Sequence, residues 1–416
     1  MKRLSKKLLF PTWMILLLVF LASGVGAAFI IFTRGLIVTN LSDMVPWGLW
    51  ITIDLSAVAL GAGAFLLSAA VYLLGIKRLE PVARTAVFIG FIGYTMACMT
   101  LLLDIGRPDR FWHAVVFWNI HSPLWEVTMC ITFYLMVLTL EVLPILGHAD
   151  WVQERWPELG DRLESIHRFA PVLAVVGLGL SLLHQSSLGA TYGVLKTRPI
   201  VYRPGMAVLF IVSAMAAGPA LTVLASKVSA RLSPRAIVND ELLDQVSRFV
   251  GWVLIAYLYF RFWDTLAMNY TYEPGRNEGL RVLTSGSLAF NFWIGEIFIG
   301  AVVPMIILLS DRLRRRQTLQ ILALLMVVGG LVAYRWDTNL VSQLVVFNML
   351  PQDLTPRYTS YTPALIEFVA GAGVIAYGLL TFTLGARYLK VVDHSSAEAE
   401  ELASAPSPVA AASAAD

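Results

Sequence analysis

The chain has 416 residues, of which 57% are hydrophobic and 14% are charged, and its formal net charge is +3. A soluble globular protein carries about 25% charged residues, so this composition indicates an integral membrane protein. The small net charge argues against a nucleic-acid-binding surface. The two cysteines, Cys98 and Cys130, exclude a disulfide framework and a cysteine-ligated iron–sulfur cluster, which needs about four thiolates.

A helix needs about 20 apolar residues to cross a bilayer, and about ten stretches of the chain meet this requirement. We expect membrane spans over 11–33, 47–75, 82–103, 124–147, 170–193, 205–227, 248–270, 287–310, 317–335 and 363–388. The first is too long for the apolar part of a secretory signal, which has about 7–15 residues, so we expect it to be retained. The predicted fold class is all-α and integral to the membrane.

The distribution of Lys and Arg predicts the orientation of these spans. Most of the 31 basic residues fall at the N-terminus and in every second loop, most densely over 311–316. Cytoplasmic loops carry such an excess, so we expect both termini on the cytoplasmic side of a bacterial inner membrane. Residues 148–168 are then a cytoplasmic loop with a short interfacial helix, and 104–123 and 336–362 are external loops. The tail over 391–416 is rich in Ala, Ser, Pro and Glu and is predicted to be disordered.

Polar side chains enter the spans mainly in the half that faces away from the termini. The stretch 181–189 places His184, Gln185 and two serines inside an apolar run. Charged residues at the same level are Asp54, Glu126, Arg261, Asp264 and Glu296. An ionised side chain at mid-bilayer costs about 2.5–3.5 kcal/mol on insertion, so these groups should be paired, wetted or functional. The half nearer the termini is predicted to be nearly featureless.

Each of these groups has more than one interpretation. Arg261 and Asp264 are three residues apart, so one interpretation is an ion pair on one helix face. Asp54 and Glu126 have no base nearby in the sequence, which favours a functional role. His184 is either a satisfied core histidine or a ligand. It is the single embedded histidine, so a haem with two histidine ligands is disfavoured, although a methionine could be a second ligand.

An imidazole, buried acids and aromatic walls would suit a quinone, whose reduction needs hydrogen-bond partners and two protons. Proton-coupled transport would use the same groups, and a passive membrane anchor is a third hypothesis. A transporter should have broken helices, for which 24–26, 61–63 and 371–373 are candidates, but small residues also serve helix packing. An acid, a Gly-Arg loop and a Trp-Glu pair recur around 104–126 and 264–296, which suits either two related bundles or chance.

Several separated motifs resemble the NrfD/PsrC superfamily of quinone-interacting membrane subunits, and most closely its HybB-like branch. In chain order they are PWGLWI at 46–51, LDIGRP at 103–108, WEV at 125–127, HQSSLG at 184–189 and RFWD at 261–264. The resemblance implies about ten helices in two four-helix bundles, over about 47–193 and 205–335, with flanking helices. It also implies a menaquinone pocket near the periplasmic face and a chain without its own haem, iron–sulfur cluster or metal.

The resemblance also implies roles for individual residues. It implies that Glu126 and His184 transfer protons. It implies that menaquinone is bound by His184, Gln185, Asp54, Tyr94, Arg107 and Trp50. It also implies a possible proton path in the second bundle, formed by Arg261, Asp264 and Glu296. The implied partners are a periplasmic ferredoxin-like iron–sulfur subunit and further periplasmic oxidoreductase or multihaem cytochrome c subunits.

Overall fold

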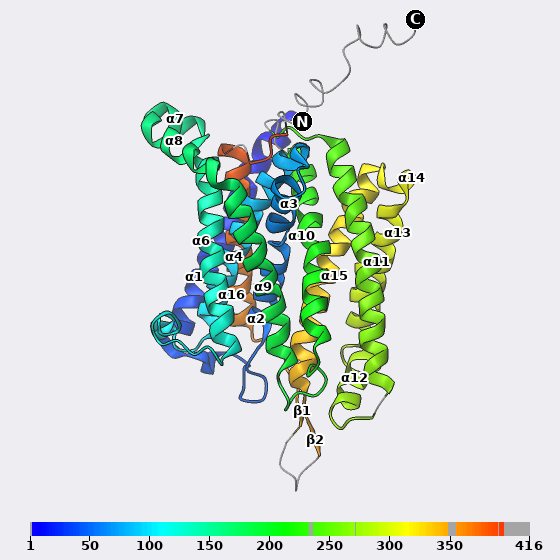
Figure 1. Ribbon diagram of the computed structural model, residues 1–416. Helices are drawn as coiled ribbons and strands as arrows, with labels where there is room; N and C mark the ends of the chain where they lie inside the picture. Colours follow the sequence, from blue (N-terminus) through cyan, green and yellow to red (C-terminus); the bar gives the residue numbers. More distant parts are fainter. Residues whose placement is uncertain (1, 233–235, 271, 348–354, 390, 395–416) are drawn as a thin grey trace, which may run out of the picture.

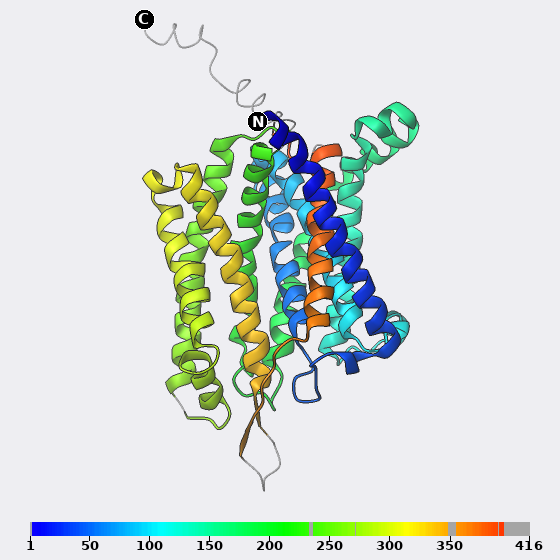
Figure 2. The same cartoon turned by 180° about the vertical axis from the view of Figure 1, so that it is seen from behind.

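The computed structural model describes residues 2–232, 236–270, 272–347, 355–389 and 391–394. Long helices stand side by side along one direction, as both views of the ribbon show (Figures 1 and 2). These helices are α1 (Lys2–Arg34), α2 (Leu49–Leu60), α3 (Gly63–Tyr72), α4 (Glu80–Asp104), α6 (Pro123–Gly147), α9 (Ala170–Gly193), α10 (Gly205–Leu232), α11 (Asp240–Tyr270), the π-helix η5 (Asn291–Val302) continued by α13 (Val303–Leu309), α15 (Gln317–Leu344) and α16 (Leu365–Tyr388).

Shorter elements lie at the two ends of the long helices. They are α5 (His113–Val116), α7 (Asp150–Arg155), α8 (Pro157–Glu164), the 3₁₀ turn η4 (Ser165–Phe169), α12 (Arg276–Thr284), α14 (Asp311–Arg314) and the antiparallel strands β1 (Val345–Phe347) and β2 (Pro356–Tyr358). Further 3₁₀ turns are η1 (Leu36–Val38), η2 (Lys77–Leu79) and η3 (Pro108–Arg110). The expected all-α class is confirmed. Within the described residues, the β-structure is one two-stranded sheet of β1 and β2, with three residues in each strand.

Within the described residues, 9 helical segments are long and apolar enough to cross a membrane. The chain is thus a multi-pass membrane protein, and these segments correspond to the expected spans except that over 248–270. That stretch forms most of α11, which packs against α10 and α13. Its aromatic residues, together with Arg261 and Asp264, lower its hydropathy below that of the other spans.

The helix expected to end at residue 335 continues to Leu344. Its last turns are polar, but Arg335, Asp337, Asn339 and Gln343 are all buried. A polar side chain that points into a bundle does not end a helix, although it ends a run of high hydropathy. The expected loop over 336–362 was therefore wrong in its first part, while residues 348–354 lie outside the described residues.

The packing of the helices supports two groups, and the division into two bundles remains our proposal. In the first group α4 packs against α2, α3 and α6, and α9 packs against α6 and α3. In the second group α10 packs against α11 and α15, and α15 packs against η5 and α13. The two groups meet where α10 contacts α9, α3 and α2. Helices α1 and α16 pack against each other, and α16 contacts α4.

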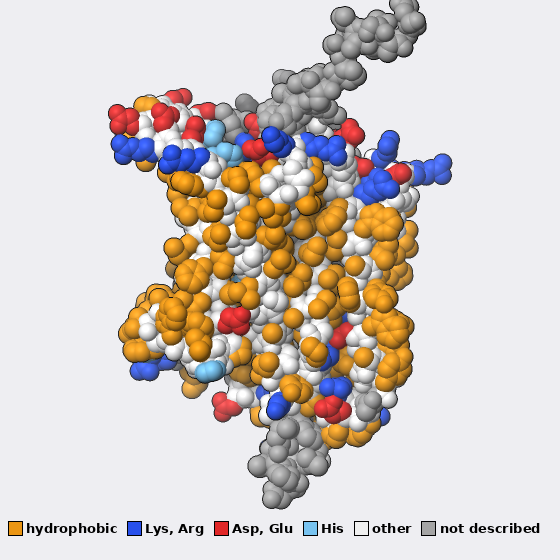
Figure 3. All heavy atoms as spheres, in the orientation of Figure 1, with side chains coloured by type: hydrophobic (Ala, Val, Ile, Leu, Met, Phe, Trp, Pro, Cys, Tyr) orange, Lys and Arg blue, Asp and Glu red, His pale blue; other side chains and the backbone are white. Residues whose placement is uncertain are grey.

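The start of α1 and the end of α16 lie at the same end of the molecule (Figures 1 and 2). Lys and Arg side chains gather at this end, where α7, α8 and α14 lie, and an apolar belt covers the middle (Figure 3). We call this the terminal end and the other the distal end. Helices α7 and α8 form the short helical segment expected within 148–168.

The first residues after α16 pack against the helices. Val391 and Val392 are buried, and the Asp393 backbone forms an isolated bridge with Ile237. His394 is also buried; its Nδ1 accepts a hydrogen bond from the Asn239 amide, and burial lowers its pKa to about 4. The remainder of the tail that we predicted to be disordered, 395–416, lies outside the described residues.

Neighbouring glycines on α15 provide a test of helix packing. A Cβ atom at Gly330 would collide with the backbone of Gly300 on η5, whereas a Cβ atom at Gly329 would meet nothing within 4 Å. Overpacking costs about 1–3 kcal/mol, and alanine is intrinsically the better helix former by about 1 kcal/mol. We therefore expect Gly330→Ala to lower the melting temperature of the detergent-solubilised protein, and Gly329→Ala to leave it unchanged or raise it. Equal melting temperatures for the two variants would contradict this contact.

Candidate functional site

A hydrogen bond between Tyr94 and His184 lies inside the first group of helices. The Tyr94 hydroxyl is 2.9 Å from Nδ1 of His184, and both side chains are almost completely buried. The ring of Tyr134, from α6, packs edge-on against Tyr94 with centroids 4.6 Å apart. Two tautomers satisfy this contact: when the phenol donates to Nδ1, the imidazole carries its proton on Nε2, and when Nδ1 donates to the phenol, Nε2 is an acceptor. No described residue hydrogen bonds to Nε2, so this nitrogen is available to a ligand.

Three further side chains, on α9, α2 and α4, have buried oxygen atoms without partners. Gln185 donates from Nε2 to the Val58 carbonyl of α2 at 3.1 Å, but its Oε1 has no hydrogen-bond partner among the described residues. Asp54, also on α2, is 3% exposed, and its Oδ1 likewise has none. Asp104, at the end of α4, has the same deficit at Oδ1. Since a buried polar atom without a partner is costly, these atoms mark a place where a ligand or water is expected.

Glu126 lies near the start of α6 and is half-buried. Its Oε1 accepts a hydrogen bond from the Ser187 hydroxyl at 2.8 Å. Ser187 is one turn from His184 on α9, so the HQSSLG stretch contacts both Tyr94 and Glu126. Glu126, near the start of α6, thus contacts this stretch directly through Ser187.

Two of the residues expected at the same site lie elsewhere. The Trp50 indole donates from Nε1 to the Glu367 carbonyl of α16 at 3.0 Å and packs with residues of α1 and α16. Arg107 is exposed in the loop after α4, where its guanidinium pairs with Asp109 at 3.1 Å. This contact raises the pKa of Arg107. The structure therefore brings Tyr94, His184 and Gln185 together, with Gln185 bonded to Val58 of α2. Trp50, at the start of α2, contacts α16 instead, and Arg107 lies in a loop.

Charged residues of the second group form an ion-pair network around Arg261, in which Nη1 of Arg203 has no described partner. Arg261 binds Glu296 through Nε at 2.6 Å and Nη2 at 3.2 Å, and it binds Asp264 through Nη1 at 3.1 Å. Asp264 also receives a bidentate contact from Arg203, at 2.5 and 2.8 Å, and Glu296 accepts a hydrogen bond from Tyr257. The i,i+3 ion pair is therefore present, as part of a larger network. Glu296 lies on η5, and π-helical segments are frequent at functional sites.

Sequence reasoning missed the polar residues at the end of α15. Arg335 is fully buried, and its guanidinium lies 3.6 Å from the centroid of the Phe210 ring. Its Nη2 donates to the Ser213 hydroxyl at 3.2 Å. Asp337 accepts a hydrogen bond from Asn291 at 2.8 Å. The sequence does indicate that the helix continues, because apolar residues recur at helical spacing through Leu340 and Leu344. The low hydropathy after residue 335 nevertheless led to a helix end being predicted there.

The prediction that the terminal half is nearly featureless was wrong. A cavity of about 450 Å³ lies there, and its lining includes Glu80, Arg84, Glu141, His148 and His167. These residues are distributed over two expected spans and two loops, so each looked isolated in the sequence. Helix packing brings them together.

The network around Arg261 can be tested through stability. Arg261→Met would leave two buried carboxylates, Glu296 and Asp264, without this partner. Breaking a buried ion pair on one side costs about 3–5 kcal/mol. We expect a clearly lower melting temperature in detergent, whereas Arg107→Gln, which removes an exposed pair, should leave it unchanged. If both variants had the melting temperature of the wild type, the network would not stabilise the fold.

Comparisons with known proteins agree with this architecture. Residues 37–346 match the family described as "Polysulphide reductase, NrfD". The chain is 35% identical over 393 residues to "Menaquinone reductase, integral membrane subunit" of Nitratidesulfovibrio vulgaris, with 92% of each chain covered. It is 24% identical to "Hdr-like menaquinol oxidoreductase integral membrane subunit" of Archaeoglobus fulgidus, over 86% of this chain and 88% of the relative. It is also 24% identical to "Probable Ni/Fe-hydrogenase 2 b-type cytochrome subunit" of Escherichia coli, over 88% and 89%. The chain therefore belongs to the NrfD family of polytopic membrane proteins.

Proposed function

We propose that this chain is the quinone-binding membrane subunit of a respiratory oxidoreductase complex, with menaquinone as the quinone. The observation that carries the proposal is the buried His184, which is fixed through Nδ1 by Tyr94 and has no partner at Nε2 among the described residues. The family relation supports it, because two of the similar proteins have names that refer to menaquinone or menaquinol.

The polar atoms around His184 fit a quinone head group. A quinone offers two carbonyl oxygens as acceptors when oxidised and two hydroxyl groups when reduced. The Nε2–H of His184 would donate to one oxygen, and the free Oε1 of Gln185 and Oδ1 of Asp54 would accept from a hydroxyl. Tyr94 acts through His184, because its hydroxyl holds the imidazole in one orientation. When bound, the quinone supplies the electron acceptor or donor.

Glu126 and His184 are the proposed proton-transfer groups. His184 exchanges a proton at Nε2, and Glu126 exchanges one at its carboxylate, which the Ser187 hydroxyl orients. The partial exposure of Glu126 supports this role, because a half-buried carboxyl group can exchange protons with groups on either side of it. A positioned acid or base of this kind contributes typically about 10²–10⁴-fold to rate.

An iron–sulfur subunit is the proposed electron partner, and we propose that it docks on the distal end. With both termini cytoplasmic, this end faces the periplasm. The exposed residues of the loop between α4 and α6 support such a contact; they include Arg107, Phe111, Trp112, Phe117 and Trp118. Interfaces are enriched in aromatic residues and Arg. Further oxidoreductase or multihaem cytochrome c subunits would complete the chain of electron carriers.

We propose that electrons pass between that partner and the quinone without a haem or iron–sulfur cluster in this chain. His184 is the one histidine within the spans, and its Nδ1 is already bonded to Tyr94. Within the described residues, no group of at least three His, Cys, Asp or Glu side chains could hold a metal ion.

A proton- or ion-coupled transporter is the alternative function. The observation that favours it is the buried network of Arg261, Asp264 and Glu296, which could also form a second proton path. Against it, the interruption between α2 and α3 is slight. Gly61 and Ala62 both keep right-handed helical dihedral angles, so the backbone carbonyls do not splay to form an ion site.

Replacing His184 tests the quinone site directly. His184→Ala removes the Nε2–H donor, and a lost hydrogen bond of this kind corresponds to about a tenfold loss of affinity. We expect the variant to bind a menaquinol-analogue inhibitor about tenfold or more weakly in a fluorescence-quench titration of the purified chain. His121→Ala, at an exposed histidine, is the matched control and should bind like the wild type. Full affinity in the His184 variant would make His184 a packing residue.

Replacing Glu126 tests the proton-transfer role. Glu126→Gln keeps the side-chain shape and can still accept from Ser187, but it cannot carry a transferable proton. We expect quinone turnover by the assembled complex to fall at least about tenfold, while the partner subunits still copurify. The control is Glu158→Gln, at an exposed glutamate of α8. Normal turnover of the Glu126 variant from pH 6 to pH 8 would remove this residue from the mechanism.

A further inference from the structure

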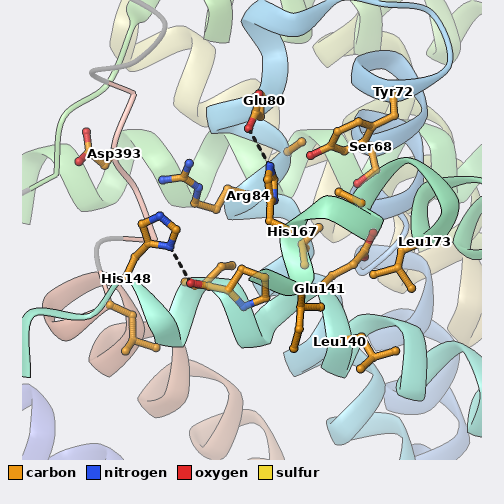
Figure 4. Close-up of a pocket in the computed structure, with 17 residues that line it drawn as sticks. Ser68, Tyr72, Glu80, Arg84, Leu140, Glu141, His148, His167, Leu173 and Asp393 are labelled. Carbon is orange, nitrogen blue, oxygen red and sulfur yellow. Dashed lines mark hydrogen bonds and ion pairs between the residues drawn. The ribbon is translucent and has the colours of Figure 1, made fainter. Parts of the chain in front are cut away.

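The cavity at the terminal end has no role in the proposed quinone reaction. It has a volume of about 450 Å³ and is enclosed by α3, the start of α4, the end of α6, and η4 with the start of α9 (Figure 4). Arg84 on its wall is ten residues before Tyr94 on α4, which corresponds to about 15 Å along the helix. The cavity is therefore separate from the site at His184.

Two oppositely charged side chains face this cavity without a direct hydrogen bond or ion pair to a described residue, although Arg84 is attracted electrostatically to Glu80. Glu80 is 3.6 Å from His167, and His148 is 3.5 Å from Glu164, so these four groups are paired. Arg84, on α4, and Glu141, on α6, make no hydrogen bond or ion pair within the part of the chain that the structure describes. One wall thus offers a free guanidinium and the other a free carboxylate.

The polar neighbours of these two charges differ. Glu141 lies on the side of Tyr72 and Ser68, whereas Arg84 lies on the side of His148 and Asp393 (Figure 4). The carboxylate and two hydroxyl groups together accept hydrogen bonds from a donor-rich cation. The guanidinium suits a phosphate, which it binds through parallel N–H···O contacts.

The remaining lining is apolar and reaches the lipid-facing surface. Val87, Leu140, Leu173 and Leu389 line the cavity, and Leu140 is 40% exposed on the outside of α6. The helix ends that line the cavity lie at the terminal end, where the apolar belt meets basic side chains (Figure 3). Phospholipid head groups occupy this level of a bilayer. The acyl chains of a lipid whose head group sits in the cavity could extend into the membrane beside Leu140.

We propose that this cavity binds the head group of a phospholipid that contains both a primary ammonium and a phosphodiester, as in phosphatidylethanolamine. The ammonium donates to Glu141 and to the hydroxyls of Tyr72 and Ser68, and the phosphate accepts from Arg84. A lipid without an ammonium leaves the carboxylate unpaired, and a quaternary ammonium cannot donate hydrogen bonds. The site therefore selects a primary amine over choline and glycerol head groups.

Lipid selectivity of the wild type provides the first test. The full chain is delipidated in detergent and titrated with phosphatidylethanolamine, phosphatidylcholine or phosphatidylglycerol, with bound lipid counted by native mass spectrometry. We expect phosphatidylethanolamine to bind at least about tenfold more tightly than the other two. Equal affinities for the three lipids would overturn the proposal. Soluble glycerophosphoethanolamine is the competitor: if it displaced the lipid with equal affinity, the site would serve a soluble ligand rather than a lipid.

Charge-neutral variants provide the second test. Glu141→Gln should weaken phosphatidylethanolamine binding about tenfold and leave phosphatidylcholine binding unchanged, whereas Arg84→Gln should weaken binding of all three phosphodiesters. The matched controls are Glu158→Gln and Arg162→Gln, both at exposed positions of α8. Wild-type lipid binding in both cavity variants would overturn the proposal. Unchanged lipid binding with slowed quinone turnover in Glu141→Gln would assign that carboxyl group to the reaction instead.

Discussion

The absence of water in the hydrocarbon region is the constraint on which the arrangement of this protein depends. Every polar group within the spans must find a partner inside the protein, because lipid offers none. The carboxylates of the network around Arg261 satisfy this rule, since Glu296 and Asp264 each receive more than one contact, whereas Nη1 of Arg203 has no described partner. The region around His184 does not, because Nε2 of His184 and oxygen atoms of Gln185 and Asp54 have no described partner. A ligand bound beside His184 would supply the partners that these atoms lack. Arg335 and Asp337 on α15 also keep atoms without a described partner.

Polar residues also connect the two groups of helices. Asn339, near the end of α15, accepts from the Tyr192 hydroxyl of α9 at 2.9 Å and donates to the carbonyls of Trp47 and Gly48, both at 3.0 Å. The rings of Trp47 and Tyr192 pack edge-on. These contacts hold the start of α2, which carries Asp54, against helices of both groups. A change at the second network could thus reach the first site through α15.

The sequence was sufficient to predict the membrane class and the positions of most spans. It was also sufficient to predict that the HQSSLG stretch is embedded in a span. Apolar length and an embedded histidine are properties of single segments, so they can be read without the fold. Arg335 and Asn339 could not be placed, because a polar residue that faces a neighbouring helix is indistinguishable in sequence from one in a loop. The position of Arg107 could not be predicted either, because its pairing with Asp109 depends on the turn after α4. The cavity with Arg84 and Glu141 exists only through helix packing.

Photoaffinity labelling with an azido-menaquinone analogue tests the central claim most directly. The purified chain is irradiated with the analogue, with and without excess menaquinone, and the labelled peptides are identified by mass spectrometry. The account predicts labelling that menaquinone suppresses on the stretch 181–189 of α9 and on the facing parts of α2 and α4. Suppressible labelling confined to the second group, around Arg261, Glu296 or Arg335, would contradict it.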